Sequence, residues 1–158
     1  MKKRNKTSVK YEIVLTKRDT DDFDRDNVSN VLNLQPIYSE APRVSKGKVY
    51  FKDFGTDSKN FTVIPQEQSP HPFIIHACWG YGRGGFDDFN ETLLDVEKIV
   101  VSRKQEFTEL CALENLSLSL SIIVSSKGRE IPFLALSQDQ ISLFASVGLS
   151  VDMRFDFE

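Results

Sequence analysis

Alternation of apolar and polar residues is the pattern that most constrains this chain. In residues 116–122, leucine and isoleucine alternate with serine, and in residues 149–158 apolar side chains alternate with serine and charged side chains. Because successive strand side chains point to opposite faces, each segment is predicted to be a strand with one buried and one wet face. Doubly covered parallel sheets show continuous apolar strands instead. The pattern favours an α+β fold, with a largely antiparallel sheet and helices packed on one face.

The first half of the chain predicts a strand, a short helix and weaker strands. Residues 9–15 alternate, with Val9, Tyr11, Ile13 and Leu15 on the buried face. A short helix follows, with Asp24 as N-cap and Pro36 as its end, since the residue before a proline is biased away from helix. Further strands are expected at residues 49–51, 61–64 and 73–79.

The second half predicts two helical regions separated by strands. The longer helix begins at Asp88, and the polar residues 102–105 are a possible break into two helices. After the strand that begins at residue 116, residues 131–136 are predicted to form another strand. Residues 137–147 read as a helix with a capping box, with Ile141, Phe144 and Ala145 toward the core and Gly148 at its C-terminus. One candidate arrangement is a ferredoxin-like βαββαβ core extended by a strand–helix–strand unit.

The size and charge of the chain limit the classes of protein to which it can belong. A chain of 158 residues suits one domain, here residues 8–158, preceded by a flexible basic tail at residues 1–7. Without the four basic residues of the tail, acidic residues outnumber basic ones by seven, which disfavours nucleic-acid binding. No apolar run is long enough to span a membrane, and two cysteines do not make a disulfide framework. A cytoplasmic protein is therefore expected.

The glycine-rich residues 80–85 form the first candidate site. They are predicted to be a flexible turn between a strand and a helix. The alternative is a recognition loop that binds a partner or ligand through Trp79, Tyr81 and Arg83. The spacing matches neither a dinucleotide fingerprint nor a P-loop. Acidic residues at the start of the next helix would also repel a phosphate.

The charged residues Asp152, Arg154 and Asp156 form the second candidate site. Their alternation with apolar residues fits either a solvated face that discourages aggregation or an acidic protein-binding surface with one arginine. No catalytic residues, metal site or cofactor are predicted. His76 and Cys78 lack paired ligands at zinc spacing, and the acidic residues 22–26 depart from a calcium loop.

Several features together resemble the bacterial domain-of-unknown-function family numbered 4279. They are the Asp-led helix that closes on Leu-x-Leu-x-Pro in residues 24–36, Trp79 at a strand end, and the pattern of residues 136–153. The resemblance implies a small α+β domain of a kind seen near bacterial toxin and defence loci, and it brings no catalytic residues.

Two functional hypotheses follow. The first is a non-catalytic domain that binds another protein, with an immunity protein that neutralises a toxin as one form. The alternative is a small-molecule-binding module with a pocket beside residues 80–85, lined by Trp79 and Tyr81.

Overall fold

A five-stranded sheet is the centre of the structure. The computed structural model describes residues 7–44, 49–52, 61–64, 74–126 and 134–157. The strands of the main sheet, in spatial order, are β2 (Tyr38–Glu40), β7 (Cys78–Phe86), β1 (Thr7–Lys17), β8 (Leu116–Ser126) and β9 (Leu149–Phe157). Neighbouring strands are antiparallel except for β8 and β9, which are parallel. Two small pairs accompany the sheet: β3 (Arg43–Val44) with β6 (Ile74–Ile75), and β4 (Val49–Lys52) with β5 (Phe61–Ile64).

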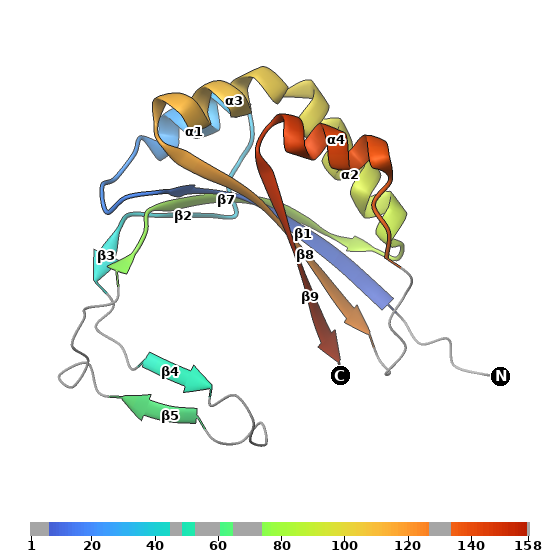
Figure 1. Cartoon of the computed structure of the whole chain (residues 1–158), viewed down its shortest axis with the longest axis horizontal. Coiled ribbons are helices and arrows are strands. Elements are labelled where there is room, and N and C mark those ends of the chain that lie inside the picture. Colours follow the sequence, from blue (N-terminus) through green and yellow to red (C-terminus); the bar gives the residue numbers. More distant parts are fainter. Residues whose placement is uncertain (1–6, 45–48, 53–60, 65–73, 127–133, 158) are drawn as a thin grey trace.

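The helices of the described residues cover one face of this sheet (Figure 1). They are α1 (Arg25–Leu32), α2 (Phe89–Ser102), α3 (Lys104–Leu113) and α4 (Gln138–Ser146). The predicted α+β class, with a largely antiparallel sheet and helices on one side, is therefore confirmed. The strand order β2-β7-β1-β8, with α1 after β1 and α2–α3 after β7, is that of a ferredoxin-like core. The helix α4 and strand β9 extend this core beside β8.

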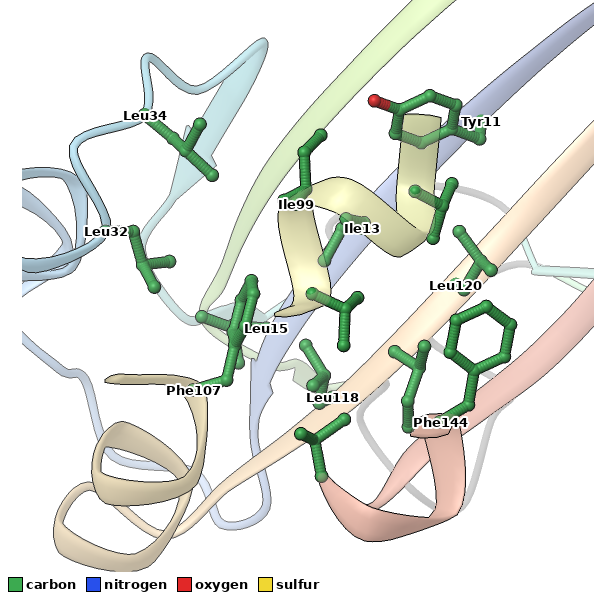
Figure 2. Packing of buried hydrophobic residues seen from close by; sticks show 14 of the residues in the cluster. Tyr11, Ile13, Leu15, Leu32, Leu34, Ile99, Phe107, Leu118, Leu120 and Phe144 are labelled. Atoms are coloured by element: carbon green, nitrogen blue, oxygen red, sulfur yellow. The ribbon is translucent and has the colours of Figure 1, made fainter. Parts of the chain in front are cut away.

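The core lies between the helices and the sheet. The predicted inner face of β1, which comprises Val9, Tyr11, Ile13 and Leu15, is fully buried. It packs with Leu118 and Leu120 of β8 against apolar stripes of the helices (Figure 2). Alternation of side chains places this apolar face toward the helices, although in β8 Ser121 and Ile123, which point to the other face, are also buried.

Polar caps set the helix ends. The carboxylate of Asp24 accepts a 2.8 Å hydrogen bond from the backbone of Asn27, as predicted for an N-cap. The prediction that Pro36 ends this helix is wrong, because the chain leaves it at Asn33, whose φ of 49° is left-handed. At α4, Ser137 and Gln140 form the predicted capping box.

Arg103 stands at the predicted break between α2 and α3. Its φ and ψ of −131° and 22° interrupt the helical path, so the expected division of the long helix is confirmed. The Arg103 guanidinium donates a 2.6 Å hydrogen bond to the carbonyl of Leu32 at the end of α1. A helix C-terminus has carbonyls without internal partners, so the break both ends one helix and caps another.

The predicted inner face of α4 is partly wrong. Phe144 is 2% exposed, as expected, but Ile141 is 54% exposed and Ala145 also faces solvent. Val147, just past the helix, fills the core instead. The helix spans fewer than three turns, so the sequence pattern permits more than one buried stripe. Of the predicted strand at residues 131–136, residues 134–136 are not in a strand and the others lie outside the described residues.

Candidate binding face

Residues 80–85 form part of strand β7, so the predicted flexible turn is wrong. Their glycines are explained by close packing across the sheet. A Cβ atom on Gly80 would overlap the ring of Tyr38, and one on Gly82 would come within 2.6 Å of the carbonyl oxygen of Tyr11. Glycine is therefore required here for close approach. The strand that was predicted at residues 73–79 is divided between β6 and the start of β7.

Trp79 is a structural residue. Its side chain is 0% exposed, and its indole Nε1 donates a 2.9 Å hydrogen bond to the Ser29 hydroxyl of α1. A buried indole with a satisfied N–H has no atom left for a ligand. Trp79 therefore anchors α1 to the sheet.

Tyr81 and Arg83 lie beside Tyr11 and Asp95. Both side chains are on the helix-covered side of β7, and the ring of Tyr81 packs at 6.5 Å from that of Tyr11. The exposed Arg83 guanidinium is 3.0 Å from the Asp95 carboxylate on α2. The hydroxyl of Tyr11 donates a 2.6 Å hydrogen bond to the same carboxylate. These contacts join β1, β7 and α2.

The Tyr11–Asp95 contact keeps the phenol protonated. Burial raises the pKa of Tyr11 far above its usual range, and the hydrogen bond and charge of Asp95 raise it further. The same carboxylate raises the pKa of Arg83. A general base or nucleophile needs a pKa near the working pH, so this cluster is suited to holding elements together.

Strand parity separates the six predicted site residues into two groups. Trp79, Tyr81 and Arg83 are on the helix side of the sheet. The other three, Asp152, Arg154 and Asp156, are on the opposite side, which we call the open face. Its central residues, taken from the strand registers, are Gly80, Gly82, Lys10, Glu12, Val14, Ser119, Ser121, Ile123, Ser150, Asp152, Arg154 and Asp156. The six residues therefore do not form one site.

One cross-strand row of the open face combines two carboxylates with a buried hydroxyl. Glu12 pairs with Gly82 on one side and with Ser121 on the other, and Ser121 pairs with Asp152. Ser121 is 8% exposed, and its Oγ has no hydrogen-bond partner in the part of the chain that the structure describes. An unsatisfied buried hydroxyl is uncommon in folded proteins, so this row is a candidate for binding a hydrogen-bond donor.

Carboxylates outnumber cations on the open face, with Glu12, Asp152 and Asp156 against Lys10 and Arg154. Burial, followed by the charge of the nearby Glu12 carboxylate, raises the pKa of Tyr38 to about 12. Asp152 is paired with Arg154 at 3.1 Å, but both side chains are more than half exposed. Sequence reasoning did not select Glu12 or Ser121, because only the pairing of β1 with β8 and of β8 with β9 brings them beside Asp152.

Strand β9 becomes more exposed along its length. On its helix side, Leu149 is buried, Val151 and Met153 are half-buried, and Phe155 is 37% exposed. The predicted alternation is present, but burial is weaker than expected toward Phe155.

The described cavities lie on the helices. One, of about 420 Å³, is lined by Leu94, Val101 and neighbouring residues of α2, and another, of about 580 Å³, continues along α3. Neither is lined by residues 80–85, where the alternative hypothesis places a pocket. Within the described ranges, no three histidine, cysteine or acidic side chains are grouped to hold a metal ion. Burial raises the pKa of both cysteine thiols, Cys78 and Cys111, which makes them less nucleophilic at neutral pH.

Comparison with known proteins gives no relative: no family model, curated protein or solved structure matches this chain. The resemblance to family 4279 stays a prediction. Among the described helices, none combines the length and apolar character needed to cross a bilayer.

Proposed function

We propose that this chain is a non-catalytic domain that binds another protein through the open face of its sheet, and that it acts as an immunity protein that neutralises a toxin. The observation that carries the proposal is the cross-strand row in which Ser121, whose hydroxyl has no hydrogen-bond partner among the described residues, lies between Glu12 and Asp152. The acidic balance of the chain and the α+β fold agree with it.

The row fits a basic side chain of a partner. An arginine or lysine inserted between Glu12 and Asp152 would donate to both carboxylates and to the Ser121 oxygen. Charge-assisted hydrogen bonds of this kind are stronger than neutral ones.

Acidic charge on the open face also suits a basic toxin. Opposite charges steer two proteins together, raise the association rate and lose this effect as salt increases. Recognition of a basic partner accounts for the carboxylates without a reaction at the site.

The test begins with the products of the genes beside the gene for this chain. Each is expressed alone and with the chain, growth is scored, and binding to the purified chain is measured by calorimetry at low and high salt. We expect one product to be toxic alone, to be neutralised by the chain and to bind it more weakly at high salt. If no product is neutralised or bound, the proposal fails.

A pair of matched double variants locates the interface. Glu12→Gln with Asp152→Asn removes two charges from the open face, and Glu109→Gln with Asp139→Asn removes two from helices α3 and α4. The open-face variant should bind at least about tenfold more weakly, a loss of about 1.4 kcal/mol, while the helix variant binds normally. Equal binding by the two variants would place the interface elsewhere.

A further inference from the structure

The open face carries its charges in three successive rows across strands β1, β8 and β9, and the sign of the charge alternates from row to row. The first row has two carboxylates, the second has two cations and the third has one carboxylate. We call them the inner acidic row, the basic row and the outer acidic row. In the strand registers they consist of Glu12, Ser121 and Asp152; Lys10, Ile123 and Arg154; and Ser8, Ser125 and Asp156.

The charged side chains of these rows reach the surface. Lys10, Asp152, Arg154 and Asp156 are exposed, and Glu12 is half-buried. The ion pair between Asp152 and Arg154, at 3.1 Å, joins two exposed side chains. Exposed pairs of this kind contribute little to stability, so both groups are available to the charges of a partner.

The spacing of the rows is that of side chains on one face of a strand. Neighbouring rows are two residues apart, which is about 6.4–6.8 Å along a strand. An extended segment that lies along these strands projects its residues i, i+2 and i+4 toward the open face at the same spacing. A helix does not match all three rows, because its residues i, i+4 and i+8 turn progressively away from a straight line.

We propose that the open face binds an extended segment of its partner in which basic, acidic and basic side chains alternate at positions i, i+2 and i+4. The two basic side chains lie over the acidic rows, and the acidic side chain lies over the basic row. The Ser121 oxygen, which is 8% exposed and has no hydrogen-bond partner among the described residues, accepts from the basic side chain over the inner row. This inference rests on the proposed function and specifies the chemistry of the partner.

The basic row distinguishes such a partner from one that is basic throughout. Lys10 and Arg154 lie one row away from the carboxylates of Glu12 and Asp152. A segment with positive charge at all three positions would therefore bring a like charge over the basic row. Like charges that meet across an interface lower affinity and reject wrong partners. The open face selects an alternation of sign over net positive charge.

Hairpin peptides test the pattern directly. Three backbone-cyclised hairpins differ only at positions i, i+2 and i+4 on one face of one strand, which carries Arg-Glu-Arg, Arg-Arg-Arg or Glu-Arg-Glu. The backbone amide shifts of the isotope-labelled chain give the affinity for each peptide and the place where it binds. We expect Arg-Glu-Arg to bind at least about threefold more tightly than either of the others, because each of its charges meets the opposite charge. The shifts should gather in β1, β8 and β9.

Removing the charge of the basic row should change the affinities for two of the peptides in opposite directions. Lys10→Gln with Arg154→Gln should weaken Arg-Glu-Arg at least about threefold and should strengthen Arg-Arg-Arg. Lys98→Gln with Lys104→Gln removes the same charge from exposed positions of α2 and α3, and should leave the preference for Arg-Glu-Arg unchanged. Circular dichroism confirms that each variant folds.

Tightest binding by Arg-Arg-Arg would overturn this inference and leave the proposal of a basic partner standing. A basic-row variant that binds Arg-Glu-Arg as tightly as the original chain would do the same. Tightest binding by Glu-Arg-Glu, shifts confined to the helices, or no shift with any peptide would also overturn it. The toxin test decides the proposed function separately: a chain that selects Arg-Glu-Arg but neutralises no neighbouring product keeps this surface chemistry and loses the immunity role.

Discussion

The Tyr11 hydroxyl donates a 2.6 Å hydrogen bond to the Asp95 carboxylate and thereby joins the central strand β1 to helix α2. Tyr11 is fully buried, whereas Asp95 reaches the surface, where Arg83 pairs with it. The contact connects the first strand of the sheet to a helix that is far away in the sequence.

Removing the Asp95 carboxylate should destabilise the fold. Asp95→Ala leaves the Tyr11 hydroxyl buried without a partner, which we expect to lower the free energy of unfolding by about 2–3 kcal/mol. Tyr11→Phe removes the hydroxyl itself and should cost less. Urea unfolding measures both. Arg83→Gln is the control and should change stability by less than about 1 kcal/mol, because its ion pair is exposed. Equal losses from Asp95→Ala and Arg83→Gln would show that the hydroxyl does not depend on the carboxylate.

Stability should fall in alkaline solution above about pH 10. The folded state raises the pKa of Tyr38 from its usual 10.0 to about 12 and raises that of Tyr11 as well. A raised folded pKa means that the unfolded chain loses its proton first. The stabilisation that comes from these raised pKa values is therefore complete below pH 10 and is lost as pH rises toward 12. Urea midpoints between pH 8 and pH 11.5 test this, and Tyr38→Phe should reduce the slope. Constant stability over that range would contradict the raised pKa values.

Glycine substitutions in β7 should differ sharply from one another. Gly82→Ala brings a Cβ within 2.6 Å of the backbone oxygen of Tyr11, which cannot rotate away, so we expect a loss of about 1–3 kcal/mol. At Gly84 the nearest atom is the Cβ of Lys10, at 3.1 Å on a strand side chain. Gly84→Ala should therefore be close to neutral. Thermal melting of the two variants decides between a packed strand and a turn, since a turn would tolerate both.

Ser121→Ala should leave stability unchanged or increase it. The Ser121 hydroxyl is buried without a partner within the described residues, and removing an unsatisfied polar group recovers up to about 1–3 kcal/mol. If the open face binds a basic side chain, the same substitution weakens that binding. Urea unfolding measures the change in stability. Calorimetry with the toxin that binds the chain measures the loss of binding. A loss of stability above about 1 kcal/mol would mean that the hydroxyl makes a hydrogen bond in the folded protein.

The sequence predicts the elements that have a local signal. Alternation in β1 and β8 and the caps at Asp24 and Ser137 act over a few neighbouring residues, so one sequence reveals them. The glycines of β7 have no side chains, so they show no alternation of apolar and polar residues. Glycine is needed there because the Tyr38 ring and the Tyr11 carbonyl pack closely against the strand, and both are distant in sequence. For the same reason, the sequence selected Asp152 but could not show that Glu12 and Ser121 lie beside it.

The central position of β1 has a consequence for how the chain folds. Tyr11 pairs with Arg83 on one side and with Ile122 on the other, so β1 is synthesised before both of the strands with which it pairs. Contacts between residues that are far apart in sequence slow the search for the native state. We therefore expect folding in milliseconds or longer, with β1 completing its pairing only after β8 has been synthesised.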